Sequence, residues 1–372
     1  MNTSQNEKKI FFLLTSDEPN NVILGHASFA KQAGLQPIFV FPFRKQSHDL
    51  ISYSQYEVIR MNFVFSTDGI YKYVLSMIKY IYYATKIIEK RKGKILAVDL
   101  TGVIAAGVIK LKGNKIFVLV NDNFSARYKM PRGIFLLIRW IEGKAYEKMA
   151  EVCIFPSKIR YEILGSPKLK KIEYLPNILN DNYVPLWVGS SSNDLKVMLC
   201  GWLVKSRGLG ILEDIILNTD QNVKFILMGS GDDQSIQRVI KNEKVQYFRH
   251  GSRNETLRRM SEIDINLALY DPDILINRYA LPQKIYDAMM IGCPLLVNSE
   301  VQMSEELREK ELCFTASYTD AKEIAKILNQ IAKNKEILKE ISKKILKYND
   351  ANLSYSSVTK KGLEIYTMLA KQ

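Results

Sequence analysis

The chain has 372 residues, of which 47% are hydrophobic and 25% charged. This composition excludes a disordered or collagen-like chain, and at roughly 150 residues per domain the length predicts two domains. Lys and Arg number 53 against 39 Asp and Glu, and residues 1–190 hold 27 of the basic and 15 of the acidic ones, so this half carries +12 of the net +14. A basic excess confined to one half favours a surface that faces an anion: lipid, phosphorylated substrate or nucleic acid.

The cysteines and the N-terminus indicate the expected compartment. The four cysteines, at 153, 200, 293 and 313, form no CxxC pair or Cys/His knuckle, so we expect no metal site and a reducing, cytoplasmic setting. The apolar run at 10–14 is too short for a signal peptide. The sequence contains no stretch of eighteen uncharged apolar residues, so we expect no transmembrane helix.

In chain order, apolar runs of strand length alternate with longer helical patterns. In the first half we expect strands at 10–15, 36–43, 56–61, 95–98, 115–120 and 152–155, and helices at 24–32, 69–92, 101–110, 133–150 and 158–164. The segment 175–185 (LPNILNDNYVP) holds two prolines and three asparagines and predicts an interdomain linker.

The alternation restarts after this linker. We expect strands at 195–200, 223–228, 245–248, 265–268, 295–297 and 312–315, and helices at 209–218, 234–241, 254–262, 283–290, 304–310, 321–333, 335–347 and 358–370. The pattern predicts an α/β chain of two Rossmann-like, doubly wound parallel sheets facing a central cleft, with ligands at the carboxyl ends of the strands. We place the domains at 1–178 and 179–352, and expect the helix within 353–372 to pack back on the first domain.

Two loops of the second half have the composition of ligand sites. In 201–214 (GWLVKSRGLGILED), Gly201 allows a tight turn while Lys205 and Arg207 bring cations to a helix start, which suits a diphosphate. The turn at 229–231 (GSG) opens the next helix, and there a structural role for glycine and close approach to a ligand are equally open.

The segment 277–298 is the richest in chemistry. Pro282 suits the first turn of a helix in which Lys284 is followed, three residues on, by Asp287. A cation near the positive helix end is unfavourable unless an anion is bound there, and the carboxylate one turn further could accept both ribose hydroxyls. The alternative is a solvated Lys–Asp pair on a surface helix.

Five segments in series resemble motifs of the retaining glycosyltransferases of the GT-B fold, the family-four type found in bacterial polysaccharide and lipopolysaccharide synthesis. They are 175–177 (similar to IPNG), 201–208 (GRLVxxKG), 223–231 (hxhhGxG), 248–251 (hFhG) and 282–294 (PxKxxEAMxxGxP), where h is apolar. The last motif is the most specific.

This resemblance implies roles for residues of the second half. Arg207 and Lys284 contact the donor diphosphate as catalytic cations, and Asp287 stands where the family has a ribose-binding glutamate. The other implied donor residues are Gly201, Gly229, Arg249, His250, Gly251, Tyr279, Ala280 and Leu281, with Arg278 beside the donor sugar. Trp202 and Tyr279 depart from an arginine and a glutamate of the family, so the donor sugar is not implied. No metal or cofactor besides the nucleotide sugar is expected.

The first half resembles the family more loosely. Residues 120–123 (VNDN) resemble a VHD segment in which Asn121 replaces the histidine. We expect Asp17, Asp99, Asn121 and Asp122 on the donor-sugar and acceptor side, with Asp122 as a catalytic candidate. For Asp99, capping a helix that begins at Thr101 is an equally good alternative. Little base catalysis is needed, because the departing phosphate can accept the acceptor proton.

Two helical segments of the basic half carry tyrosines or tryptophan beside cations. In 69–92, Lys72, Lys79 and Lys86 share one face, and an apolar side is expected from Val74, Met77, Ile78 and Ile81; the segment 133–150 contains Arg139 and Trp140. Such helices suit an anionic bilayer surface. The alternative is a pair of core helices solvated by lysines.

Together these patterns predict a glycosyltransferase, peripheral on the cytoplasmic face of the cell membrane. It transfers a hexose, with retention, from a nucleoside diphosphate sugar, UDP in preference to GDP, to a lipid-linked glycan or a lipopolysaccharide or capsule precursor. The alternatives are a sugar-nucleotide epimerase of the same shape and a non-catalytic basic protein that binds nucleic acid or membrane. No recognisable nucleic-acid module is present, so nucleic acid is not an expected partner.

Overall fold

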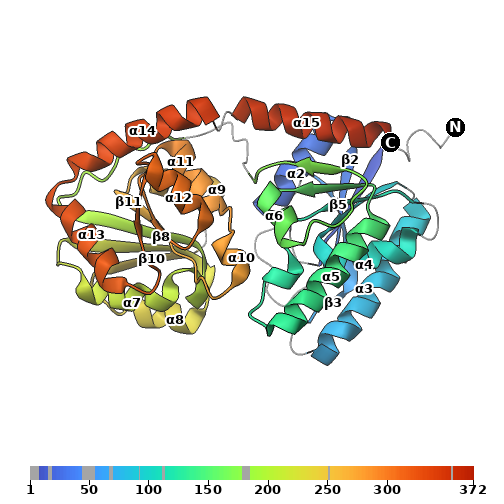
Figure 1. Ribbon diagram of the computed structural model, residues 1–372, viewed down its shortest axis with the longest axis horizontal. Helices are drawn as coiled ribbons and strands as arrows, with labels where there is room; N and C mark the ends of the chain where they lie inside the picture. Colours follow the sequence, from blue (N-terminus) through green and yellow to red (C-terminus); the bar gives the residue numbers. More distant parts are fainter. Residues whose placement is uncertain are drawn as a thin grey trace. The chain divides into compact units, whose positions relative to one another are not determined.

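The computed structural model (Figure 1) describes residues 8–15, 19–43, 55–66, 70–91, 93–110, 114–177, 185–249, 252–352 and 355–372. The chain divides into two compact units. Unit 1 comprises Met1–Asn180 with Tyr355–Gln372, and unit 2 comprises Asp181–Ser354.

Unit 1 is built on a seven-stranded parallel sheet in the order β3-β2-β1-β4-β5-β6-β7. Its strands are β1 (Lys9–Leu13), β2 (Gln36–Phe43), β3 (Glu57–Val64), β4 (Lys94–Val98), β5 (Ile116–Leu119), β6 (Val152–Phe155) and β7 (Ile172–Tyr174). Its helices are α2 (Asn21–Gln32), α3 (Ile70–Arg91), α4 (Asp99–Lys110), α5 (Arg132–Met149), α6 (Lys158–Ile163) and α15 (Tyr355–Lys371), with a 3-10 turn, η1, at Phe124–Ala126. The short strand β7 lies where no strand was expected.

Helices cover both faces of this sheet, because successive residues of each strand point to opposite sides. Phe11 and Leu13 of β1 join the core under α3, α4 and α5, whereas Ile10 and Phe12 join the core under α2 and α15. Strands buried on both faces read as continuous apolar runs, which is why β1 is KIFFL.

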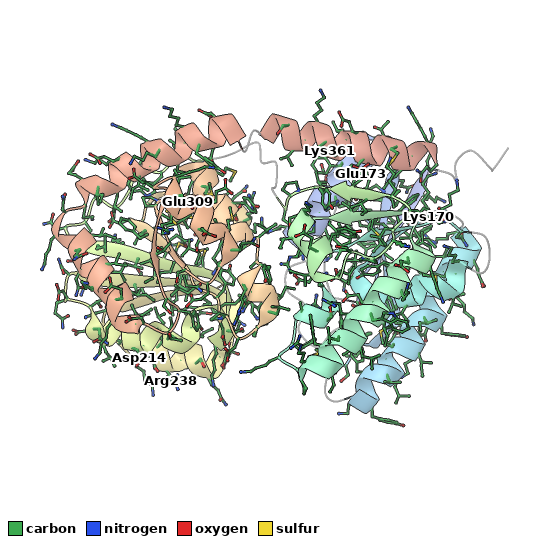
Figure 2. All side chains as sticks on the ribbon, viewed as in Figure 1. Lys170, Glu173, Asp214, Arg238, Glu309 and Lys361 are labelled. Carbon is green, nitrogen blue, oxygen red and sulfur yellow. The ribbon has the colours of Figure 1, made fainter. Side chains whose placement is uncertain are left out.

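The last helix, α15, packs against α2 within unit 1. The ring Nδ1 of His26 lies 3.0 Å from the hydroxyl of Tyr366, and both side chains are buried. Lys361 forms an ion pair of 2.8 Å with Glu173 of β7 (Figure 2). A side chain at Gly362 would lie 2.8 Å from the Phe29 ring, so glycine lets the two helices approach.

Unit 2 repeats the architecture with six parallel strands in the order β10-β9-β8-β11-β12-β13. The strands are β8 (Leu195–Leu203), β9 (Val223–Gly231), β10 (Val245–Arg249), β11 (Ile265–Ala268), β12 (Leu295–Asn298) and β13 (Cys313–Ala316). The helices are α7 (Leu209–Asn218), α8 (Asp233–Val239), α9 (Arg253–Ser261), α10 (Leu275–Arg278), α11 (Gln283–Ile291), α12 (Gln302–Glu309), α13 (Ala321–Lys333) and α14 (Glu336–Asn352), with a 3-10 turn, η2, at Lys205–Arg207. This is the strand order of a dinucleotide-type doubly wound fold, and the expected fold class is confirmed.

Strands β8 and β9 extend further than expected. Gly201–Leu203 and Gly229–Gly231, expected as loops, pair with each other in register. A Cβ at Gly229 or Gly231 would lie 1.9 or 2.0 Å from the carbonyl oxygen of Gly201 or Leu203. Glycine is therefore required at these two positions because the two strand backbones approach closely there.

Candidate functional site

Two cations lie close to the same aromatic ring at the carboxyl edge of the unit 2 sheet. Arg207 lies in η2, after β8, and Lys284 lies in the first turn of α11, which Pro282 precedes. The Arg207 guanidinium carbon and the Lys284 Nζ each lie 5.5 Å from the centre of the same ring, that of Tyr270, which follows β11. The structure therefore brings together the two cations that the sequence nominated for the diphosphate.

Lys284 is held without a compensating charge. Its Nζ is buried and has no hydrogen-bond partner among the described residues. Burial lowers the pKa of Lys284 from 10.5 to about 8; Cys200 opposes this effect and Arg207 adds to it. A buried ammonium group is costly unless it is paired, so this arrangement favours the arrival of an anion.

Gly201 supplies the backbone beside these cations. Its φ of +95° is in the left-handed region, and the position that a Cβ would take lies 4.0 Å from Cε of Lys284. Because glycine has no side chain, the space beside Lys284 stays open at this position.

A buried polar frame holds Tyr270 in place. The N–H of Tyr270 donates to Oδ1 of Asn298 at 2.7 Å, and Nδ2 of Asn298 donates to the Tyr270 carbonyl at 3.1 Å and to Glu300 at 2.8 Å. Glu300 accepts the backbone N–H of Tyr318, whose hydroxyl donates to the carbonyl of Lys205 at 2.9 Å. The frame connects the loop that carries Arg207 to the ring beneath both cations.

The sequence nominated none of these frame residues. The available signal was Asn298 itself, a polar residue that is completely buried at the end of an apolar strand. A buried amide needs partners.

Asp287 is paired with Arg253, the first residue of α9. The distance from the guanidinium Nη2 to Oδ1 is 2.6 Å, and the side chains are only 11% and 14% exposed. Burial raises the pKa of the Asp287 carboxyl and the Arg253 guanidinium opposes that rise. The alternative of a solvated Lys284–Asp287 surface pair is wrong, because the partner of Asp287 is Arg253 and both groups are largely buried.

The other residues predicted to bind the donor lie along the same carboxyl edge of the unit 2 sheet. Arg249 is exposed at the end of β10 and is in register with Gly229 of β9. Tyr279, Ala280 and Leu281 connect α10 to α11, and Ala280 is buried. His250 and Gly251 lie outside the described residues.

Arg278 was expected in a loop but is the last residue of the short helix α10. Its side chain is exposed, and its Nε donates to the carbonyl of Pro272 at 2.6 Å. This bond directs one face of the guanidinium towards its own loop.

In unit 1, the candidate acceptor residues gather at the carboxyl ends of β4 and β5. Asp99 has a φ of +56°, and its Oδ1 accepts the backbone N–H groups of Asn121 and Asp122 at 2.7 and 2.9 Å. Arg127 bridges Asp99 and Asp122 at 3.2 and 3.4 Å, and Arg160 lies 3.6 Å from Asp122. Asp17, the other nominee, lies outside the described residues.

The alternative role of Asp99, as the cap of a helix that begins at Thr101, is not what the structure has. The helix α4 begins at Asp99 itself, and its carboxylate binds the segment after β5. Burial raises the pKa of Asp99 to about 7, although Arg127 opposes this effect. A positive φ in a non-glycine residue stores strain, and such strain is common at functional sites.

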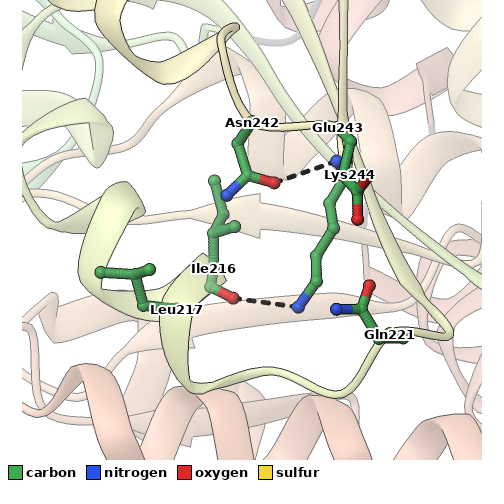
Figure 3. Close-up of a pocket in the computed structure, with 6 residues that line it drawn as sticks. All are labelled: Ile216, Leu217, Gln221, Asn242, Glu243 and Lys244. Carbon is green, nitrogen blue, oxygen red and sulfur yellow. Dashed lines mark hydrogen bonds between the residues drawn. The ribbon is translucent and has the colours of Figure 1, made fainter.

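A small cavity of 270 Å³ lies on unit 2 among Ile216, Leu217, Gln221, Asn242, Glu243 and Lys244 (Figure 3). It adjoins the segments that precede β9 and β10, at the amino edge of the sheet, away from the cations. The Lys244 ammonium donates to the carbonyls of Ile216 and Thr219 at the end of α7, so it stabilises a helix C-terminus.

Residues 210–361 match a family model described as glycosyl transferase-like. The search of curated proteins found no match. Among solved structures, sucrose-phosphate synthase from Thermosynechococcus elongatus is similar at a TM-score of 0.76 and 13% identity, over 98% of this chain and 99% of that one. Anabaena HepE, solved in complex with UDP-glucose, has a TM-score of 0.70 and 14% identity, over 97% and 99%.

WaaG, described as a glycosyltransferase involved in lipopolysaccharide biosynthesis, has a TM-score of 0.70 and 10% identity, over 96% of this chain and 99% of that one. At these identities the structural matches show the fold, and the family model adds the activity. The chain is a glycosyltransferase of the GT-B fold. The family resemblance seen in the five motifs is thus confirmed, and the match favours the glycosyltransferase over the epimerase and the non-catalytic protein.

Within the described ranges, no group of three or more His, Cys, Asp or Glu residues could hold a metal ion. None of the helices in that part of the chain combines the length and the apolar character needed to span a bilayer.

Proposed function

We propose that this glycosyltransferase uses a nucleoside diphosphate hexose, UDP-linked in preference to GDP-linked, and that Arg207 and Lys284 bind its diphosphate. The observation that carries the proposal is the buried Lys284 ammonium group, which has no hydrogen-bond partner among the described residues. It shares the Tyr270 ring with a second cation, Arg207. The complex of the similar Anabaena HepE with UDP-glucose agrees with this donor class.

The reaction breaks the bond between the anomeric carbon and the diphosphate oxygen, and negative charge grows on the diphosphate as it leaves. Two cations already in place stabilise that charge without reorganisation. The acceptor hydroxyl loses its proton to the departing phosphate, which carries the charge left by the broken bond. By family resemblance the new bond retains the anomeric configuration.

The test replaces each cation. Arg207→Ala and Lys284→Ala should each reduce turnover by about 100-fold, because each removes one charge-assisted contact to the leaving group. Arg238→Ala, at an exposed cation of α8 that pairs with Glu213, is the matched control and should leave turnover unchanged. Wild-type turnover in both site variants would refute the assignment.

The donor base is tested by thermal shift. A panel of nucleoside diphosphates and their sugars should raise the unfolding midpoint most for uridine compounds, since a ligand that binds the native state stabilises it. A larger shift with GDP would overturn the base preference.

Radiolabelled sugar should reach product only when an acceptor glycan is present, whereas an epimerase would convert the donor alone.

We further propose that the acceptor is a lipid-linked glycan or a lipopolysaccharide or capsule precursor, met at the cytoplasmic face of the cell membrane. The supporting surface is made by α3, α4 and α5, of which α4 packs against both neighbours (Figure 1). These helices contain ten basic and four acidic residues. Large apolar side chains are exposed on all three: Val74, Ile78 and Tyr82 on α3, Ile104 and Val108 on α4, and Leu137, Trp140 and Ile141 on α5.

The apolar side expected for α3 is therefore divided. Met77 is buried with Tyr80, Ala84 and Ile88, but Val74 and Ile78 are 48% and 58% exposed. A solvated core helix would not expose these residues beside lysines, whereas a helix lying on anionic lipid would.

Sedimentation with vesicles tests this surface. The full chain should bind phosphatidylglycerol vesicles at low salt and dissociate at high salt, and the double variant Ile78→Asp/Trp140→Asp should bind at least tenfold more weakly, since it removes apolar contacts and adds negative charge. Leu217→Asp, at an exposed apolar residue of unit 2, is the control. Equal binding to neutral vesicles would refute the electrostatic part of the proposal.

A further inference from the structure

The Arg253–Asp287 pair joins two helices that reach the carboxyl edge of the unit 2 sheet. Arg253 is the first residue of α9, Asp287 lies in the second turn of α11, and the two helices are in contact. The bond of 2.6 Å between largely buried side chains is charge-assisted and short. A pair in this position fixes the start of α9 relative to α11.

Arg253 is at an unfavourable place for a cation. The N-terminus of a helix carries partial positive charge, and the first residue of α9 lies at that end. The hydroxyl of Ser252 already accepts the N–H of Glu255 at 3.2 Å, so α9 is capped without Arg253. The guanidinium is thus not required to cap the helix, and it forms an ion pair with Asp287 of α11.

Asp287 also differs from what its motif implies. An aspartate is one methylene shorter than the glutamate of the resembling family, so its carboxylate reaches less far from α11. The bond from Oδ1 to Arg253 holds the carboxylate in one orientation, and the guanidinium opposes the rise in pKa that burial causes. Without the guanidinium, a carboxyl in this setting would be a poorer acceptor, because burial disfavours the ionised form.

We propose that Arg253 is a positioning residue for the nucleoside half of the donor: it holds Asp287 as the acceptor of the ribose hydroxyls. This inference rests on the proposed function, in which Asp287 receives the ribose while Arg207 and Lys284 receive the diphosphate. The site then has two parts that fail separately. The Arg253–Asp287 pair selects the ribose, and the two cations on the Tyr270 ring bind phosphate regardless of the nucleoside.

The experiment measures the affinities of UDP, 2′-deoxy-UDP and inorganic pyrophosphate for the full chain by titration calorimetry. Wild type should prefer UDP to 2′-deoxy-UDP by about tenfold, the worth of one hydrogen bond to a charged acceptor. Arg253→Met should reduce that preference to less than about threefold and leave pyrophosphate affinity within about twofold. Arg253→Lys, which retains a cation, should keep part of the preference.

Asp287→Asn serves as the second variant, because it keeps the shape of the side chain and removes its charge. If Arg253 acts through Asp287, adding Arg253→Met to Asp287→Asn should not change the preference for the ribose any further. A further change in the double variant would refute the positioning role. So would a wild-type preference in Arg253→Met.

Two other outcomes separate this inference from the proposed function. Equal losses of UDP and pyrophosphate affinity in Arg253→Met would assign Arg253 a general structural role and overturn the inference alone. A wild-type chain that binds neither UDP nor pyrophosphate would overturn the proposed function and, with it, the inference.

Discussion

Replacing Lys284 by methionine measures what it costs to hold an unpaired ammonium group in the interior. Its pKa of about 8, against an ordinary value of 10.5, corresponds to about 3 kcal/mol of unfavourable free energy for the charged form. Methionine loses the contact of the cation with the Tyr270 ring, which is worth about 1 kcal/mol. We therefore expect Lys284→Met to be about 2 kcal/mol more stable than wild type at pH 7, even though its turnover should be about 100-fold lower.

The gain has a definite pH dependence. The pKa of Lys284 is lower in the folded chain than in the unfolded chain, so between about pH 8 and 10.5 the unfolded state binds more protons. Wild-type stability therefore rises through this window relative to the variant. The advantage of Lys284→Met should be greatest below pH 8 and should have narrowed clearly at pH 9.5.

Thermal unfolding of the full chain at pH 7 and pH 9.5 provides the assay. For a unit of this size, about 2 kcal/mol corresponds to a rise in the unfolding midpoint of roughly 5 °C. Lys205→Met, at an exposed lysine of η2, should not change the midpoint. A less stable Lys284→Met at pH 7, with Lys205→Met unchanged, would show that the ammonium group is satisfied in the native state and would refute the reasoning.

Three further predictions concern the scaffold. Asn298→Ala removes both bonds to the Tyr270 backbone and should lower the free energy of unfolding by about 2–3 kcal/mol, measured in urea. Gly231→Ala would place a methyl group 2.0 Å from the Leu203 carbonyl oxygen and should lower the unfolding midpoint, whereas Gly133→Ala, in open space on α5, should not. Burial lowers the pKa of His26 from 6.5 to about 4, so wild-type stability should fall between pH 6.5 and 4 while His26→Asn is flatter there; equal slopes would contradict this.

Hydrophobic periodicity predicted most of the fold, and two of its failures, at the ends of β8 and β9, have the same cause. The expected bounds of β6, α7, β11 and α13 agree with the structure, because each of these elements is a well-delimited apolar or amphipathic run. The ends of β8 and β9 were wrong because glycine was taken as a loop signal. At these positions glycine is needed because the backbone of the neighbouring strand lies too close for a side chain. The sequence of one strand does not indicate how close its neighbour lies.

The part of the candidate site that lies in loops directly after parallel strands could be predicted from the sequence. Arg207 and Lys284 could be named as diphosphate candidates because the carboxyl ends of parallel strands meet at one edge and because each residue lies near the start of a helix. Their surroundings were not found. Arg253 is 34 residues from Asp287, and Asn298 is 28 residues from Tyr270, so no local pattern indicates either pairing.

The return of α15 to unit 1 has a consequence for how the protein is made. The apolar surface of α2, with Phe29, is covered by Ile365, Tyr366 and Leu369, which follow all of unit 2 in the chain. At ribosomal speed, the 174 residues from 181 to 354 take on the order of 10–30 s to synthesise. During that interval the apolar surface of α2 is exposed to solvent. Unit 1 then depends on chaperones or on the limited stability that it has without α15. Its maturation therefore waits for translation to reach the final helix.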